Sequence, residues 1–198
     1  MAKKKTADAT TEPNKALVAL MSGKKLTASH LKTLRTLGES IIDAFLVHVG
    51  VEDPASRTDK NRWRHLRLES AEGIAGMTEQ DGQLYLHVEA VIMKMPSDRD
   101  LIQGLMREAL ELNCTLPGAC SIGIRGSQLV ASATENMRSL RNGEEFATLI
   151  HTVMALANTL DDGLQEKYGR TTKTRKQSSD GIDSNQVSGG RAQASTNG

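Results

Sequence analysis

The chain has 198 residues, of which 38% are hydrophobic, 25% charged and 3% aromatic, and its formal net charge is +1. This length fits one domain with appendages and leaves no room for a second domain of ordinary size. The sequence contains no run of about 18 apolar residues, and Lys3 to Lys5 lead into polar residues rather than a signal-peptide core, so we expect a cytoplasmic protein without a transmembrane helix.

The small net charge hides an uneven distribution along the chain. Residues 26–169 hold 14 Lys and Arg against 20 Asp and Glu, a net charge of −6, whereas the two ends hold 11 basic and 4 acidic residues, a net charge of +7. An acidic body repels phosphate, so any attraction to nucleic acid is expected to come from the ends.

The composition divides the chain into three parts. Residues 1–25 are predicted to be a disordered basic arm, although residues 16–21 are apolar enough to dock as a turn of helix or to bind another molecule. Residues 26–169 carry the regular apolar spacing of a folded domain. Residues 170–198 are predicted to be a disordered polar and basic tail, because they lack the apolar residues needed to offset chain entropy.

The first half of the domain begins with a helix and continues with three strands. The helix starts near Thr27, a plausible N-cap, and ends at Gly50. Its apolar stripe consists of Leu31, Leu34, Leu37, Ile41, Ile42, Phe45 and Val49. Leu66 and Leu68 alternate with polar residues as in a strand, and a weaker strand is expected over residues 73–78. The pair Asp81-Gly82 predicts a tight hairpin turn into a long central strand over residues 83–95.

The second half is predicted to be a helix, a hairpin and a last helix. Pro96 ends the central strand, and Ser97 can cap the helix that follows, whose wide apolar stripe contains Leu101, Ile102, Leu105, Met106, Ala109 and Leu110. Strands over residues 120–125 and 129–133 form the second hairpin. Asn142 and Glu145 resemble a capping box at the start of the last helix. We therefore expect an α+β fold, an antiparallel sheet with helices packed on it in the order α-βββ-α-ββ-α.

Motifs with a defined catalytic chemistry are missing from the sequence. We find no nucleophile elbow, no P-loop, no dinucleotide-binding fingerprint and no His-Glu-x-x-His. His65 and His87 could start a metal site together with Glu89, but histidines of an ordinary sheet explain them better. Cys114 and Cys120 are expected to be buried small hydrophobic residues. We therefore predict no catalytic residue, no metal site, no cofactor and no enzymatic activity.

A mixed basic and aromatic segment surrounds the single tryptophan, Trp63. The basic residues are Arg57, Lys60, Arg62, Arg64 and Arg67. Such a mixture can bind single-stranded nucleic acid by stacking and phosphate contacts. The acidic remainder of the domain and the shortage of other aromatic residues favour a second interpretation, in which Trp63 packs at the sheet margin or anchors a partner protein.

The order of elements and two short stretches carry a resemblance to a known group of proteins. The stretches are Leu-Tyr-Leu-His-Val-Glu at residues 84–89 and Arg-Glu-Ala-Leu-Glu-Leu-Asn at residues 107–113. Over about Thr27 to Tyr168 the chain resembles the type III secretion chaperone-like group, which includes the Tir-chaperone and YbjN families. Chaperones of this group are cytosolic homodimers that hold an unfolded segment of a client protein without ATP or cofactor.

The resemblance implies roles for particular residues. Trp63, Leu66, Leu68 and Tyr85 would line the grooves that bind a partner, and Leu101, Leu105 and Met106 on the central helix would form the dimer interface. Core packing is the alternative for the leucines and Met106. The basic ends depart from a compact secretion chaperone. Two other functions therefore stay open, a YbjN-like regulatory protein and a nucleic-acid-associated factor that acts through its basic tails.

Overall fold

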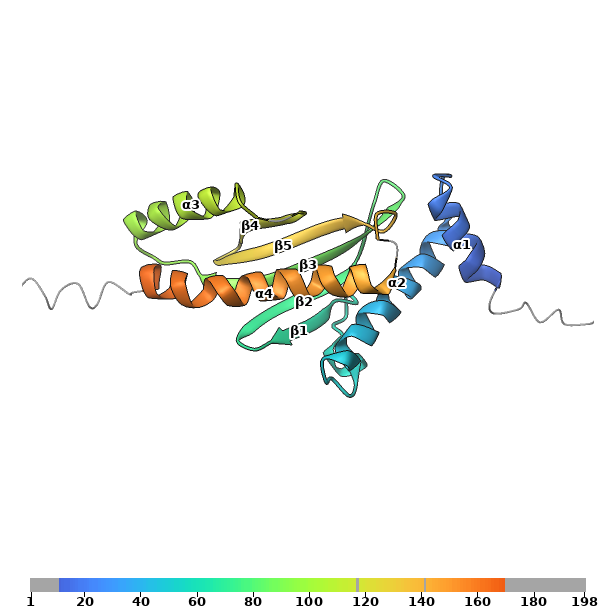
Figure 1. Cartoon of the computed structure of the whole chain (residues 1–198), viewed down its shortest axis with the longest axis horizontal. Coiled ribbons are helices and arrows are strands. Elements are labelled where there is room, and N and C mark those ends of the chain that lie inside the picture. The colour runs from blue at the N-terminus through green and yellow to red at the C-terminus, as the bar shows by residue number, and fades with distance from the viewer. Residues whose placement is uncertain (1–10, 117, 141, 170–198) are drawn as a thin grey trace, which may run out of the picture.

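The computed structural model describes residues 11–116, 118–140 and 142–169 of the chain. This part forms an α+β fold in which four α-helices accompany one five-stranded sheet (Figure 1). The elements are α1 (Thr11–Met21), α2 (Ala28–His48), the short 3-10 helix η1 (Pro54–Arg57), β1 (Arg64–Leu68), β2 (Ala71–Gln80), β3 (Gln83–Lys94), α3 (Arg99–Asn113), β4 (Cys120–Arg125), β5 (Gln128–Asn136) and α4 (Gly143–Tyr168). From α2 onward, the predicted order α-βββ-α-ββ-α is confirmed.

The sheet is antiparallel throughout, with the strand order β1-β2-β3-β5-β4. The first three strands follow one another as a meander, and the second hairpin joins them through β5, which pairs with β3. The long strand β3 is therefore central, as its apolar pattern predicts. Asp81 and Gly82 form the turn between β2 and β3, with φ of 52° and 70°, values that a two-residue hairpin turn requires.

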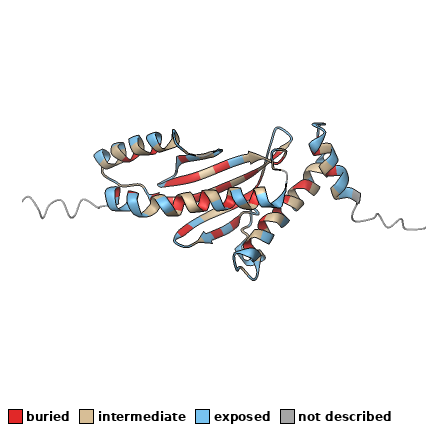
Figure 2. Ribbon diagram, in the orientation of Figure 1, coloured by how far each residue is buried: buried red, intermediate tan, exposed pale blue. Residues whose placement is uncertain are grey.

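The hydrophobic core lies between one face of the sheet and the helices (Figure 2). Helix α4 crosses this face over β3, and α2 packs beside it near the β2–β3 hairpin. Two glycines show how closely the layers approach. A Cβ on Gly38 of α2 would lie 2.7 Å from the sulfur of Met77 in β2, and a Cβ on Gly73 would lie 2.8 Å from the sulfur of Met154 in α4. A larger residue at either position would displace a buried methionine, and at Gly73 it would also collide with the carbonyl oxygen of Glu89.

Side-chain caps fix the starts of three helices. Thr27 Oγ1 accepts a hydrogen bond from the amide of His30 at 3.2 Å, and Asn142 Oδ1 accepts one from the amide of Glu145 at 2.9 Å, which confirms both predicted N-caps. The predicted cap of α3 was wrong by one residue. Asp98, rather than Ser97, accepts from the amides of Asp100 and Leu101, because its carboxylate also complements the positive end of the helix.

The N-terminal arm differs from its prediction. Residues 11–21 form helix α1, which packs against α2 with Ala16 and Leu20 buried, so the prediction of disorder was wrong for this segment. The apolar run at residues 16–21, noted as able to dock, supplies the buried side of the helix. The predicted disorder of residues 1–10 and 170–198 lies outside the described residues. No helix in the described part of the chain is long and apolar enough to span a membrane.

Neither cysteine is the buried core residue that was expected. Cys114 is exposed because it caps the C-terminus of α3, and Cys120 is half-buried because it begins the edge strand β4. Partial burial raises the pKa of the Cys120 thiol. Both cysteines are free thiols.

Candidate partner-binding surfaces

One face of the sheet is open. Helices α2 and α3 both contact α4, which lies on the core face, so no helix among the described residues covers the opposite face. Side chains alternate between the two faces along each strand, and the strand register brings the outward residues together. This open sheet face carries His65 and Arg67 of β1, Ile74, Gly76 and Thr78 of β2, Tyr85, His87 and Glu89 of β3, and Ser132 and Thr134 of β5.

Trp63 lies on the open sheet face, where its ring covers Gly76. A Cβ on Gly76 would come within 2.6 Å of the tryptophan ring, so only glycine allows this contact. The ring also meets the His87 ring edge-on, with 5.6 Å between the ring centroids. Asp59 holds the loop in place, because its carboxylate accepts from the backbone amide of Trp63 at 3.0 Å. Trp63 is half-buried, which leaves part of an anchored aromatic ring available to a partner.

Polar side chains around the two aromatic residues of the open sheet face pair with one another. His87 Nδ1 lies 2.7 Å from Thr134 Oγ1, and Arg125 Nη1 donates to Glu89 Oε1 at 2.6 Å. Burial lowers the pKa of His87 and outweighs the opposing attraction of Glu89. Tyr85 is half-buried on the same side of β3. A partner therefore meets two aromatic side chains beside polar groups of β3, β4 and β5 that are already paired.

The four residues expected to line partner-binding grooves do not share a surface. Trp63 and Tyr85 lie on the open sheet face, whereas Leu66 is buried at 4% exposure on the core face and pairs with Gly73. Leu68 is half-buried and has the same orientation as Leu66 because it lies two residues further along β1. Without a rearrangement of β1, Leu66 contributes to the core and not to a binding surface.

The basic segment around Trp63 is divided by ion pairs with α2. Arg64 donates two hydrogen bonds to the carboxylate of Asp43, at 2.9 and 3.0 Å, and its pKa is raised mainly by this interaction. Arg62 pairs with Glu39, whose side chain is only 6% exposed. These contacts neutralise the two arginines next to Trp63. The segment no longer forms the continuous positive surface that nucleic-acid binding requires.

Helix α3 presents the residues predicted for a dimer interface in two different environments. Leu105 is fully buried in the core of the single chain, so its side chain does not lie at the surface. Leu101 and Met106 are half-buried. Leu110, on the same stripe as Met106 one turn later, is 63% exposed. The apolar stripe of α3 is thus wide enough to fill the core with one edge and to leave the other edge at the surface.

The exposed edge of α3 continues onto the edge strand β4. The side-chain amide of Asn113 donates to the carbonyl of Ile122 at 2.9 Å and accepts from its amide at 2.7 Å, which ties the end of α3 to β4. Ile124, two residues further along β4, is 48% exposed. Leu110 and Ile124 were absent from the predicted interface. Their exposure depends on how α3 and β4 pack, which helical or strand periodicity does not reveal.

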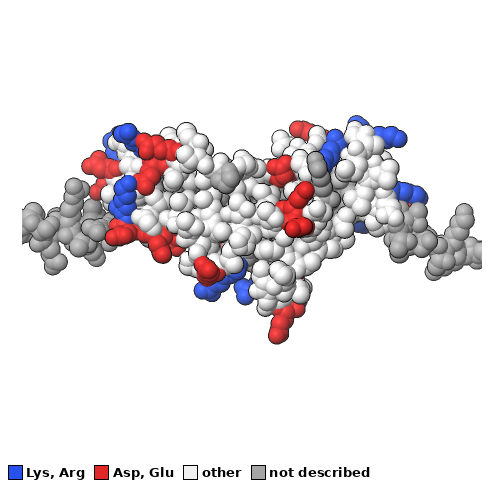
Figure 3. Space-filling view, viewed as in Figure 1, with Lys and Arg blue, Asp and Glu red and all other residues white. Residues whose placement is uncertain are grey.

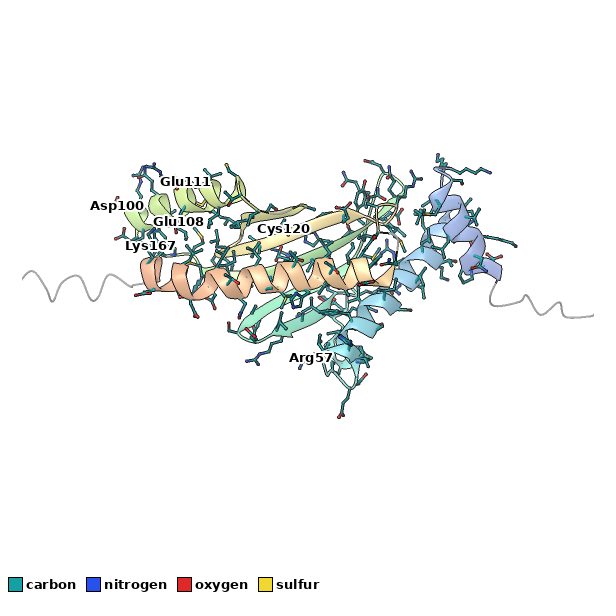
Figure 4. All side chains as sticks on the ribbon, viewed as in Figure 1. Arg57, Asp100, Glu108, Glu111, Cys120 and Lys167 are labelled. Atoms are coloured by element: carbon teal, nitrogen blue, oxygen red, sulfur yellow. The ribbon has the colours of Figure 1, made fainter. Side chains whose placement is uncertain are left out.

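The middle of α3 is fastened to the end of α4. Tyr168 packs over Gly104, and its hydroxyl donates to Glu108 Oε2 at 2.6 Å. Lys167 also pairs with Glu108 (Figure 4). The hydrogen bond from Lys167, followed by that from Tyr168, lowers the pKa of Glu108. Helix α3 is therefore fixed at its middle and at its C-terminal end, which holds its outer edge in a defined position.

No metal site is visible in the described residues. His87 Nε2 lies 4.0 Å from Glu89 Oε2, but no group of three or more His, Cys, Asp and Glu side chains converges there or elsewhere in this part of the chain. His65 lies two strands away from β3 in β1. His65 is therefore an ordinary histidine of the sheet and does not join His87 and Glu89.

The fold is type III secretion chaperone-like, as comparison with solved structures shows. The chain superimposes on a structure of the ExsC–ExsE complex with a TM-score of 0.52 and 12% sequence identity, covering 66% of this chain and 96% of the other. Two further similar structures are the HopA1–SchA chaperone–effector complex (TM-score 0.44, 11% identity, 63% and 92% covered) and ExoU–SpcU from Pseudomonas aeruginosa (TM-score 0.39, 18% identity, 61% and 95% covered). The sequence matches no protein-family model and no curated protein.

Proposed function

We propose that this chain is a non-enzymatic, chaperone-like protein that binds a segment of a partner protein. The observation that carries the proposal is the fold shared with the ExsC–ExsE structure, which is itself a complex of two proteins. The sheet face left open by the helices supports it, because this face offers the anchored ring of Trp63 and the neighbouring Tyr85. Aromatic residues in fixed positions are typical anchors of protein interfaces.

The second part of the proposal is that the protein acts as a homodimer through α3 and β4. Ile102, Met106 and Leu110 recur every fourth residue and so lie on one stripe of α3, beside the exposed Ile124 of β4. In a two-fold dimer the same surface serves both subunits, so the apolar stripe and the edge strand of one subunit would meet those of the other. Leu101 borders the surface, whereas Leu105 supports it from the core.

Capture of partners from a lysate of the native cell tests the first part. The bait is the wild-type chain in about 1 M salt, where the Debye length of about 3 Å suppresses attraction by the basic ends. We expect one dominant protein to be retained, and its retention to be lost with the double variant Trp63→Ala, Tyr85→Ala. The matched control is Val47→Ala on α2, which removes an apolar residue that is 57% exposed and that belongs neither to the open sheet face nor to α3 and β4.

Light scattering of the purified chain tests the second part. A mass of twice the monomer supports the dimer, and a monomer at all concentrations contradicts it.

In the capture experiment, retention of the partner that is the same for the wild type and the double variant would contradict the role of the open sheet face, whatever the mass. Capture of nucleic acid at low salt, lost on removal of residues 170–198, would instead support a function of the tails.

A further inference from the structure

A shallow groove lies between α1 and the start of α2, on an element that the sequence pattern did not predict. Helix α1 packs on α2 through Ala16 and Leu20, and the turn after it leaves a cavity of about 540 Å³. We call this cavity the α1 groove. It is lined by Asn14, Lys15, Val18, Ala19, Ser22, Lys24 and His30.

The α1 groove is positively charged on a body that is otherwise acidic. Its lining contains two lysines and a histidine and no acidic residue, whereas residues 26–169 carry a net charge of −6. Lys15 has one partner, Glu12 at 3.6 Å, and both side chains are more than half exposed. Arg138 adds a further positive charge beside the groove, because its Nη2 donates to the carbonyl of Lys24 at 3.1 Å. Figure 3 shows Lys and Arg side chains around this end of the molecule.

Two buried nitrogen atoms at this site lack hydrogen-bond partners in the described part of the chain. They are Nδ1 of His30, which lines the groove, and Nε of Arg138. A buried polar atom without a partner is unfavourable, so a ligand that brings a hydrogen-bonding group to these nitrogens gains affinity. The groove also offers an apolar contact, since Val18 in its lining is 69% exposed.

We propose that the α1 groove binds an acidic segment of a partner protein, at a site separate from the open sheet face. Carboxylates of the segment pair with Lys15 and Lys24, and an apolar side chain packs on Val18. The chain's own ends are poor occupants, because residues 1–10 and 170–198 carry net charges of +2 and +3, the same sign as the groove. Nucleic acid is disfavoured because the lining contains no Phe, Tyr or Trp on which a base can stack, and only two lysines to contact phosphates.

Selection from a displayed library of random peptides, at low salt on the full-length chain, tests this proposal. Each selected peptide is then measured by fluorescence anisotropy against the wild type and the variant Lys15→Glu, Lys24→Glu. We expect a class of peptides rich in Asp and Glu with an apolar residue, and we expect the variant to weaken their binding about tenfold or more, as two reversed surface charges do. Lys94→Glu, an exposed lysine on β3 outside the groove lining, is the matched control and should leave binding within about twofold.

Three outcomes would overturn the proposal. One is a selection that yields no acidic peptides. Another is a set of acidic peptides whose affinity falls equally with Lys94→Glu and with the groove variant, which indicates general attraction. The third is an oligonucleotide that binds more tightly than the peptides and loses affinity with the same two substitutions. Because Trp63 and Tyr85 take no part in this binding, their double variant should bind the acidic peptides normally, which separates a failure here from a failure of the proposed function.

Discussion

Leu105 and Leu110 lie one and a half turns apart on α3 in opposite surroundings, so paired substitutions separate stability from association. Leu105 is fully buried, whereas Leu110 is 63% exposed. Leu105→Ala removes buried methyl groups and leaves a cavity, so we expect the free energy of unfolding to fall by about 2–5 kcal/mol. Leu110→Ser removes a side chain that is already in water in the monomer, so its effect on the monomer should stay within about 0.5 kcal/mol.

Urea unfolding followed by circular dichroism, repeated at several protein concentrations, measures both effects. The apparent stability of a dimer rises with concentration, whereas that of a monomer does not. We expect Leu110→Ser to remove the concentration dependence and to halve the mass in light scattering. We expect Leu105→Ala to keep the dimer at temperatures where the chain is folded, because the residue is not at the surface.

Two results would refute this reasoning. If Leu110→Ser lowers the stability of the monomer as much as Leu105→Ala does, then the packing of α3 differs from that described here. If Leu110→Ser leaves a dimeric wild type fully dimeric, then the outer edge of α3 is not the interface. The second result would leave the fold intact and direct attention to another surface.

Three further predictions concern pH and stability. Burial lowers the pKa of His87 in the folded state, so below its ordinary pKa of about 6.5 the unfolded state binds more protons than the folded state. The free energy of unfolding should therefore fall as the pH drops through about 6.5. His87→Gln should flatten this pH profile, measured by urea unfolding between about pH 5 and 7.5. Tyr168→Phe removes the hydroxyl that donates to Glu108, so we expect the free energy of unfolding to fall by about 1–2 kcal/mol at neutral pH. The pKa of Glu108 is lowered in the folded state, and the loss should be smaller once acid protonates this carboxylate. Asn142→Ala removes the N-cap of α4 and should cost about 1 kcal/mol, measured as a fall in Tm of about 2–4 °C, whereas Asn142→Ser should retain most of the stability.

Most individual elements follow from local sequence patterns, and the structure confirms them. The alternation of Leu84, Leu86 and Val88 places these residues on one face because side chains alternate along a strand. Asp81-Gly82 specifies a turn because both residues tolerate positive φ. Asn142 caps α4 because its short side chain reaches a free amide three residues on. Each of these signals depends on residues at most a few positions apart.

The candidate site was only partly predictable. Trp63 and Tyr85 stand out as the large aromatic residues of the strand region, but the contact of Trp63 with Gly76 depends on how β2 lies against the preceding loop. The basic segment looked like a continuous positive surface. Its partners Glu39 and Asp43 lie about 20 residues earlier on α2, and no local pattern connects an arginine with a carboxylate at that separation.

The sequence by itself determined the helices and strands from Thr27 onward, the turns between them and the acidic character of the body. Only the tertiary structure decided that β5 pairs with β3, that Leu105 is buried while Leu110 is exposed, and that residues 11–21 form a helix against α2. The physical reason is the range of the interactions. Periodicity, capping and turn chemistry act within a few residues, whereas strand pairing, burial and ion pairing depend on segments that come together only when the whole core forms.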